Sequence, residues 1–174
     1  GVLLALVDGD TRARLQIIER TTRQLQVART VHLADAEIHV VARALHERSG
    51  RRGVWLGLNM ANVVEGLAES QLFGHRKGAF SGALADQTGA FDAAHQGSLL
   101  LDEVAELAPA LQAKLLRTVE TGEVHRIGDP LPHLVDVRLV TATHRDLAEM
   151  SQSGHFRTGL YWRIAHSVIE VPAL

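Results

Sequence analysis

Short apolar runs alternate with longer helix-like segments along this chain, and this alternation constrains the fold more than any other feature. The runs have the length of strands and cover residues 3–7, 26–33, 54–59, 98–102, 137–143 and 167–171. Helical spacing of apolar residues predicts helices over residues 11–24, 37–47, 111–120 and 146–150. Alternation of this kind predicts an α/β fold with a mostly parallel sheet and helices on both faces. In such a sheet, ligands bind beyond the carboxyl ends of the strands.

The composition fits a single globular domain and excludes several classes of protein. The chain has 174 residues, of which 46% are hydrophobic, so it is long enough to bury an α/β core. A formal charge of −2 gives no electrostatic reason to bind nucleic acid directly. The absence of cysteine excludes disulfides and thiolate metal sites, and it suits a cytoplasmic protein. The apolar runs are far shorter than a membrane span, so no membrane association is expected.

An acidic pair follows one of the predicted strands. The run over residues 98–102 reads SLLLD, and Asp102 and Glu103 lie at its carboxyl end. Two carboxylates at this position can hold a hydrated Mg²⁺ ion and polarise a water molecule. The same pattern also occurs where a strand simply ends before an acidic helix start. The pair by itself leaves both interpretations open.

A single phenylalanine stands in a glycine-hinged segment that reads HRKGAFSGA over residues 75–83. Gly78 and Gly82 would allow this loop to rise and fall, because glycine tolerates backbone conformations that other residues avoid. Phe80 would then supply an exposed apolar anchor for a partner. The alternative is a simple turn whose phenylalanine packs back onto the core.

Several blocks of the sequence, in the order in which they occur, resemble the AAA+ domain of sigma-54-dependent transcription activators, the bacterial enhancer-binding proteins. The blocks read ESQLFGHRKGAFSGA, GAFDAAHQGSLLLDEVAELAPALQAKLLRTVETGEVHRIGD, DVRLVTATHRDL and GHFRTGLYWRI. The resemblance covers about residues 39–174, and it places the AAA+ sigma-54-interaction core at residues 37–174. It implies a three-layer αβα core of the P-loop NTPase type with a mostly parallel sheet.

The resemblance gives the phenylalanine loop a partner, the sigma-54 RNA polymerase holoenzyme. The family carries a G-A-F-T-G-A loop on the face of a hexameric ring, where it engages sigma-54. The matching residues here are Gly78, Ala79, Phe80, Ser81, Gly82 and Ala83. Ser81 stands in place of threonine and keeps the hydroxyl but lacks one methyl group. We therefore expect the contact to survive in a slightly weakened form.

The resemblance also implies nucleotide chemistry at the acidic pair, with ATP and Mg²⁺ as the ligands. Asp102 would ligate Mg²⁺, and Glu103 would activate the hydrolytic water. Asn59 matches an asparagine that pairs with that glutamate and links the nucleotide state to the loop. Thr143 and His144 lie where the family senses the γ-phosphate, with His144 in place of the usual asparagine.

Two arginines near the end of the chain match arginines that reach into the nucleotide of a neighbouring subunit. Arg157 and Arg163 would neutralise charge that develops on the transferred phosphoryl group. For Arg163 alone, a surface salt bridge is the alternative. The sequence departs from the family here, because Thr158 and Gly159 replace an acidic pair.

The phosphate-binding loop of P-loop ATPases has no recognisable counterpart in this sequence. Such a loop needs several glycines and a lysine directly before a helix. This chain has no glycine between Gly9 and Gly50 and no lysine before Lys77, while Asp35 and Glu37 place negative charge where the triphosphate would lie. We therefore expect impaired nucleotide binding and ATPase activity, together with weak assembly into a ring. The alternative function is that of a nucleotide-independent pseudo-ATPase or sigma-54-binding module.

Residues 1–36 allow two interpretations. They resemble the start of a response-regulator receiver domain, with an apolar strand, an acidic cluster and a helix; the matching residues are Val7, Asp8, Asp10, Arg14 and Leu15. The other interpretation is the entry helix and first strand of the AAA+ domain with an eroded loop. At its other end the sequence stops where the family continues into a helical lid and a DNA-binding helix-turn-helix. A lid and direct DNA binding are therefore not expected.

Overall fold

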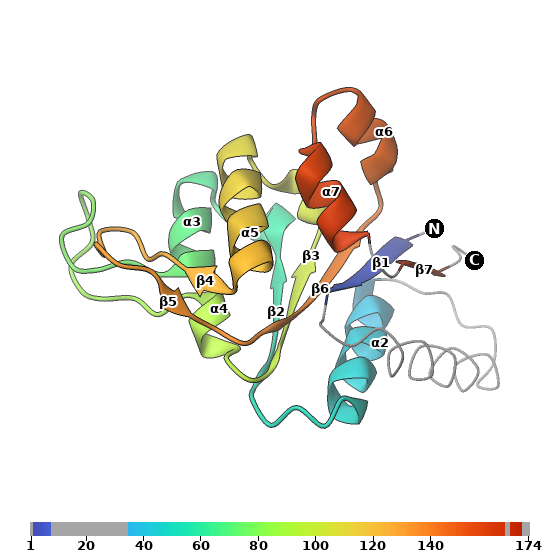
Figure 1. The fold of residues 1–174 in the computed structure, drawn as a ribbon, viewed down its shortest axis with the longest axis horizontal. Helices are drawn as coiled ribbons and strands as arrows, with labels where there is room; N and C mark the ends of the chain where they lie inside the picture. The colour runs from blue at the N-terminus through green and yellow to red at the C-terminus, as the bar shows by residue number, and fades with distance from the viewer. Residues whose placement is uncertain (1, 8–34, 166–167, 172–174) are drawn as a thin grey trace.

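A five-stranded sheet forms the centre of the computed structural model, which describes residues 2–7, 35–165 and 168–171. The strands lie side by side in the order β2–β3–β6–β1–β7 (Figure 1). Their bounds are β1 (Val2–Val7), β2 (Trp55–Asn59), β3 (Ser98–Asp102), β6 (Arg138–Thr143) and β7 (Val168–Val171). Strands β2, β3 and β6 are parallel, so their carboxyl ends meet at one edge of the sheet.

Strand β1 departs from the parallel arrangement. It pairs antiparallel with both β6 and β7, and Leu3 at its start lies opposite Thr143 at the end of β6. The prediction of a mostly parallel sheet is confirmed for the three strands β2, β3 and β6. The sequence does not predict the antiparallel direction of β1, because a short apolar run does not show whether a strand is parallel or antiparallel to its neighbours.

Helices cover both faces of the sheet and complete a three-layer αβα arrangement (Figure 1). The helices are α2 (Asp35–Arg48), α3 (Glu65–Phe73), α4 (Ala90–Ala93), α5 (Pro109–Thr121), α6 (Leu147–Gln152) and α7 (Thr158–Ile164), with two 3-10 turns, η1 (Met60–Asn62) and η2 (Val104–Glu106). Among the described helices, only α2 packs against one face, where it buries Leu100 and Val140 of the sheet. The other face buries Leu99 and Leu101 under α3 to α7. Successive residues of β3 thus point to opposite faces, and both faces are apolar because both are covered.

The end of α2 is tied to the sheet by a histidine. Nδ1 of His46 lies 2.9 Å from the hydroxyl oxygen of Ser98, and its ring lies near Trp55. Burial lowers the pKa of His46, and the nearby positive charge of Arg138 lowers it further. Both effects favour the neutral form of the imidazole over the protonated form.

The predicted helices over residues 37–47, 111–120 and 146–150 are confirmed as α2, α5 and α6, each within two residues at both ends. The predicted helix over residues 11–24 and the predicted strand over residues 26–33 lie outside the described residues. A short hairpin, β4 (Glu123–Val124) with β5 (His133–Leu134), was not predicted. Strands of two residues have no periodic pattern for a sequence to reveal. None of the described helices is long and apolar enough to cross a lipid bilayer.

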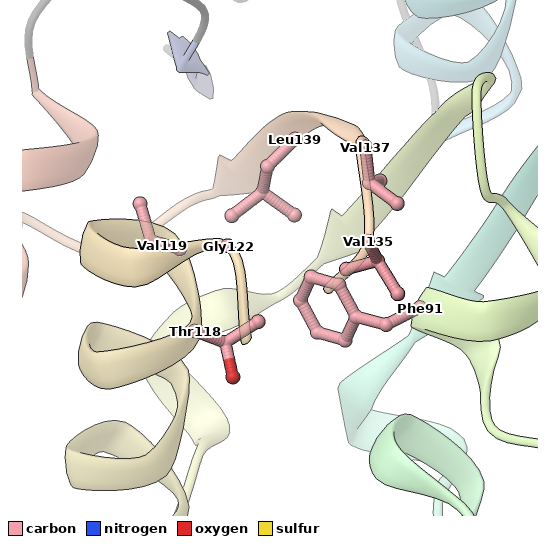
Figure 2. Close-up of a pocket in the computed structure, with 7 residues that line it drawn as sticks. All are labelled: Phe91, Thr118, Val119, Gly122, Val135, Val137 and Leu139. Atoms are coloured by element: carbon pink, nitrogen blue, oxygen red, sulfur yellow. The ribbon is translucent and has the colours of Figure 1, made fainter. Parts of the chain in front are cut away.

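A small pocket of about 80 Å³ opens beside the last turn of α5 (Figure 2). It is lined by Phe91, Thr118, Val119, Gly122, Val135, Val137 and Leu139. Its side chains are apolar apart from the hydroxyl of Thr118, and none of them is charged. The pocket therefore offers no charged side chain to a phosphate, and the candidate sites lie elsewhere.

Candidate functional site

The acidic pair lies at the carboxyl edge of the sheet, as the sequence predicts. Asp102 ends the fully buried strand β3 and is itself only 2% exposed. Its Oδ1 accepts a hydrogen bond from the backbone N–H of Glu103 (2.9 Å), and its Oδ2 accepts one from the amide of Asn59 (3.0 Å). Both oxygens of this buried carboxylate are thus held by donors, which is what a charge in an apolar layer requires.

Asn59 pairs with Asp102 in this structure, which differs from its expected pairing with Glu103. The reason is the register of the sheet, because Asn59 and Asp102 are the last residues of β2 and β3 and lie directly opposite each other. The side-chain oxygen of Asn59 also accepts a hydrogen bond from the N–H of Ala61, which caps the turn η1. This one side chain therefore connects the turn to the buried carboxylate.

Glu103 adopts a left-handed backbone conformation with φ 53° and ψ 47°. This conformation costs a residue other than glycine about 1–2 kcal/mol and persists only where its surroundings hold it. Oγ1 of Thr143 donates a hydrogen bond to Oε2 of Glu103 (3.3 Å), and Nε2 of His144 lies 3.5 Å from Oε1. The structure therefore brings Thr143 and His144 to the second carboxylate, at the end of the neighbouring strand β6.

His39 of α2 was missed by the sequence reasoning. Its Nε2 lies 3.9 Å from Oδ2 of Asp102, and its side chain is partly exposed. The ring lies over Gly57, where an added Cβ would come within 3.0 Å of Cε1. His39 lies among the apolar positions of an amphipathic helix, and only the packing of α2 against the sheet reveals its neighbour.

The donor set at this edge fits a hydrated Mg²⁺ ion better than a fully protein-bound metal. Among the described residues, no group of three or more histidine, aspartate or glutamate side chains is arranged to enclose a metal ion. Mg²⁺ in nucleotide sites is commonly held by one or two carboxylates, with water and phosphate as the other ligands. Asp102 and Glu103 are adjacent carboxylates of this type.

Arg157 directly precedes α7 and Arg163 lies in its last turn, and both side chains contact backbone carbonyls of α5. Nε of Arg157 donates to the carbonyl of Pro109 at the start of α5 (3.3 Å), and its backbone N–H donates to Gln112 (2.8 Å). A guanidinium nitrogen of Arg163 donates to the carbonyl of Val119 near the end of the same helix (3.3 Å). The alternative for Arg163, a surface salt bridge, is not among the contacts of the described residues. The two arginines do not join the acidic pair within one chain.

The phenylalanine loop is closed by backbone hydrogen bonds. His75 and Gln87 exchange two of them at its base (3.0 and 2.9 Å), and the N–H of Gly78 donates to the carbonyl of Ala83 (2.8 Å). Gly78 and Gly82 have φ values of 80° and 105°, which glycine alone adopts without strain. The predicted need for glycine is met at both positions.

Phe80 at the tip of this loop is partly exposed and lies outside the core. Its side chain is 37% exposed, and its ring meets the buried ring of His75 edge-on at 4.9 Å. The alternative of a phenylalanine packed back onto the core is therefore not what the fold shows. Ala83, by contrast, is buried and anchors the end of the loop.

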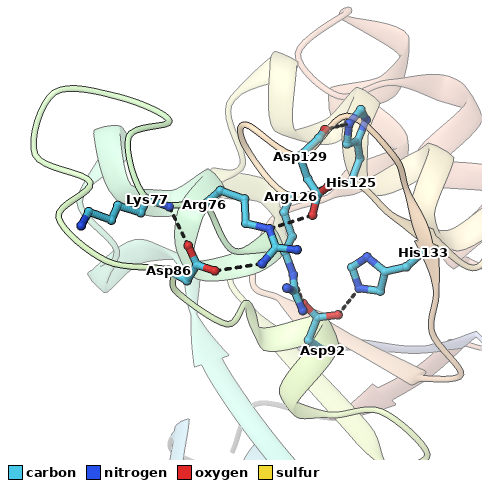
Figure 3. A network of polar contacts seen from close by, with 8 residues as sticks. All are labelled: Arg76, Lys77, Asp86, Asp92, His125, Arg126, Asp129 and His133. Atoms are coloured by element: carbon cyan, nitrogen blue, oxygen red, sulfur yellow. Dashed lines mark hydrogen bonds and ion pairs between the residues drawn. The ribbon is translucent and has the colours of Figure 1, made fainter.

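A polar network joins the base of the loop to the β4–β5 hairpin (Figure 3). Arg76 binds Asp86 on the far side of the loop (2.8 Å) and Asp129 on the hairpin (3.0 Å). The carboxylate of Asp86 also accepts the backbone N–H of Lys77 (2.8 Å). These contacts lower the pKa of Asp86, the hydrogen bond from Lys77 most and Arg76 next, and the two carboxylates raise the pKa of Arg76.

Two further side chains of the same hairpin contact Asp92 of α4. Nε of Arg126 lies 2.9 Å from Oδ2 of Asp92, and His133 contacts the other carboxylate oxygen. Asp92 is almost buried, so the pair is screened less by water than the exposed contacts of Arg76 are. The hairpin is thus fixed both to the loop and to the helix that follows the loop.

Comparison with known proteins supports the family resemblance of this chain. The model of the family described as "Sigma-54 interaction domain" matches residues 36–170. The chain is 49% identical over 136 residues to the Nif-specific regulatory protein of Herbaspirillum seropedicae, which covers 78% of this chain and 25% of that protein. The crystal structure of NtrX from Brucella abortus has a TM-score of 0.71 and 31% identity, over 90% of this chain and 36% of that one. The structure of NtrX in complex with ATP has a TM-score of 0.69 and 32% identity, over 91% of this chain and 35% of that one.

The fold and these neighbours define an AAA+ domain of the α/β class. More narrowly, the chain belongs to the sigma-54 interaction domain family, the AAA+ module of sigma-54-dependent transcriptional activators. It spans between about a quarter and a third of the length of the curated relatives it matches.

Proposed function

We propose that this chain is the sigma-54-contacting AAA+ core of a bacterial transcriptional regulator and that residues 78–83 form the contact. The observation that carries the proposal is the partly exposed Phe80 on a closed loop with two left-handed glycines. A partly exposed aromatic side chain on a loop closed by hydrogen bonds can act as a binding hot spot. The bacterial cytoplasm, where RNA polymerase works, is the matching location.

We propose further that the carboxyl edge of the sheet is the nucleotide side of this core. Asp102 would hold Mg²⁺, which supplies charge neutralisation for a bound triphosphate. Glu103 would accept the proton of the attacking water, with Thr143 and His144 holding its carboxylate in place. Asn59 would carry a change at Asp102 into the turn η1, because it binds both.

Arg157 and Arg163 have a proposed role between subunits. Among the described residues, both guanidinium groups contact backbone carbonyls of α5, and these contacts do not neutralise their charge. In a hexameric ring they would face the nucleotide of a neighbouring chain and neutralise its phosphates. Without bound nucleotide the ring interface lacks this anion, and we expect weak self-association.

ATP turnover by this chain is proposed to be impaired. Residues 10–34, directly before α2, contain no glycine and no lysine, which a phosphate cradle needs. Asp35 and Glu37 at the start of that helix add negative charge instead. This favours a sigma-54-binding module that works without nucleotide as the second candidate function.

The test of the sigma-54 contact is the substitution Phe80→Ala. Loss of a central aromatic anchor typically costs about 2 kcal/mol, so affinity for purified sigma-54 should fall roughly thirtyfold. The melting temperature should change little, because the ring is outside the core. Trp162→Ala serves as the control, since Trp162 is an exposed aromatic on α7. Unchanged binding, or a large loss of stability, would remove the functional role of the loop.

The test of the nucleotide side is calorimetry with Mg-ATP, followed by a phosphate-release assay. We expect binding too weak to measure at micromolar protein and negligible hydrolysis. Robust phosphate release that disappears in Glu103→Gln would contradict impaired turnover and reveal a phosphate cradle of another kind.

A further inference from the structure

A buried serine–histidine pair contacts Phe80 from below the surface. Oγ of Ser70, in α3, lies 2.6 Å from Nδ1 of His75, and both residues are buried. Helix α3 ends just before Gly74, where φ is 79° and an added Cβ would lie 2.6 Å from the carbonyl oxygen of Gln87. This tight turn returns the chain to the helix and brings His75 back to the serine five residues before it.

The hydrogen bonds of the pair run in one direction. Oγ of Ser70 donates to Oε1 of Gln87 (3.4 Å). A hydroxyl group has a single hydrogen, so the serine oxygen must accept in its contact with Nδ1 of His75. Nδ1 therefore carries a hydrogen and donates it to Ser70. Two backbone hydrogen bonds between His75 and Gln87 fix the main chain as well, so the imidazole is held at both ends.

The fixed imidazole lies against the phenylalanine ring. The centroids of the His75 and Phe80 rings are 4.9 Å apart, and their planes are inclined at 65°. This is the edge-to-face arrangement that aromatic pairs favour. Phe80 belongs to neither apolar cluster of the described core, so core packing does not set the orientation of its ring. The contact with His75 can do so instead.

We propose that His75 is a positioning residue for Phe80, and that the imidazole, locked by Ser70, holds the phenylalanine ring in the orientation that binds sigma-54. The inference rests on the proposed function, because the ring that His75 orients is the proposed contact. Helix α3 thus sets the position of this ring through a side chain. Without the lock the ring populates other orientations, and the apparent affinity falls in proportion to the fraction that remains competent.

A second serine–histidine pair provides a matched control. Nδ1 of His46 lies 2.9 Å from Oγ of Ser98, and the aromatic ring beside this imidazole is that of Trp55. Ser98 is buried, as Ser70 is. Trp55 packs against the apolar cluster under α2, away from the loop. Ser98→Ala and Ser70→Ala therefore remove the same group from the same kind of partner, but only Ser70→Ala does so beside Phe80.

The first measurement follows the ring of Phe80 by fluorine NMR of the full chain labelled with para-fluorophenylalanine. The chain has four phenylalanines, and Phe80→Leu identifies the signal of the one in the loop. The three others are buried, namely Phe73, Phe91 and Phe156. Ser70→Ala should shift the Phe80 signal, and Ser98→Ala should leave it in place. His75→Asn should also shift it, because asparagine keeps a donor near Ser70 but lacks the ring that reaches Phe80.

The second measurement is the affinity of the same variants for purified sigma-54. An edge-to-face ring pair is worth about fivefold in an equilibrium constant. Ser70→Ala and His75→Asn should therefore each weaken binding about fivefold, which is less than the loss in Phe80→Ala. Ser98→Ala should bind like the unmodified chain, even where it lowers the melting temperature as much as Ser70→Ala does.

The two measurements separate this inference from the proposed function. A Phe80 signal that stays in place in both Ser70→Ala and His75→Asn overturns the inference, whatever the affinities are. Equal weakening of sigma-54 binding by Ser98→Ala and Ser70→Ala would assign the effect to general destabilisation and would also overturn it. An unmodified chain that does not bind sigma-54 contradicts the proposed function, and the fluorine spectra then decide by themselves whether His75 positions Phe80.

Discussion

Two regions of the molecule use polar side chains differently. At the carboxyl edge of the sheet, polar side chains are buried and hydrogen-bonded to one another. The phenylalanine loop and the β4–β5 hairpin, together called the tip, are instead joined by charged side chains on the surface. Asp102 is 2% exposed and accepts two hydrogen bonds from fixed neighbours. Arg76 and Asp86 face water and bind each other and the hairpin by ion pairs. Both regions thus rely on a carboxylate that accepts hydrogen bonds, but the carboxylate is buried at the edge of the sheet and exposed at the tip.

The difference determines how each region can respond. Removing one partner of a buried carboxylate leaves a desolvated group, so the edge of the sheet has few alternative arrangements. Exposed ion pairs contribute little to stability and are weakened by salt, so the ion pairs of Arg76 should depend on salt more than the hydrogen bonds of Asp102 do.

The largest expected effect on stability comes from breaking the rigid edge with Asn59→Ala. This change removes the amide donor of Asp102 and the cap of η1, and together these should cost about 2 kcal/mol. Urea denaturation measures the free energy of unfolding. Asn62→Ala is the control, because Asn62 is an exposed asparagine in the same turn. Equal stability of the two variants would show that the carboxylate of Asp102 does not depend on Asn59.

A smaller effect on stability is expected when Gly82 of the loop and Gly66 of a helix are each replaced by alanine. An added Cβ would meet open space at both Gly82 and Gly66, but φ is 105° at Gly82, while Gly66 lies in α3. Gly82→Ala should therefore destabilise the chain by about 1 kcal/mol through backbone strain alone. Gly66→Ala should stabilise it by about 0.5 kcal/mol through helix propensity. Thermal melts of both variants check the sign, and stabilisation by Gly82→Ala would contradict the loop conformation.

The smallest effect concerns the ion pairs of the tip. The pKa of Asp86 is lowered, so its contribution to stability is complete above the ordinary pKa of a carboxyl group and is lost as the pH falls through the lowered value. Above that ordinary value the tip should be insensitive to pH. Carboxyl NMR titration checks the direction of the shift.

Arg76→Gln tests the same contacts at neutral pH. The pKa of Asp86 should rise but stay below its ordinary value, because the hydrogen bond from Lys77 remains the larger cause. Amide hydrogen exchange should quicken over residues 78–83 and stay unchanged in β3. Faster exchange in β3 as well would show that the tip and the edge are not separate regions.

The sequence by itself determined the class of fold, the acidic pair and the glycines of the loop. Each of these rests on a local constraint. Burial on both faces of a sheet requires a continuous apolar run such as that of β3, and a positive φ requires glycine at Gly78 and Gly82. The acidic pair at the end of β3 can be predicted for the same reason, because the change from apolar residues to Asp102 and Glu103 lies within a few residues.

Which side chains contact one another could be seen in the three-dimensional structure but not in the sequence. The antiparallel direction of β1 and the register that pairs Asn59 with Asp102 depend on how separate segments pack. His39 reaches Asp102 only because α2 crosses β2 and β3 at that point. Arg76 and Asp129 are 53 residues apart in the sequence, and they bind each other because the fold places the loop beside the hairpin. Local patterns encode burial and backbone conformation, while contacts between distant segments depend on the packing of the whole domain.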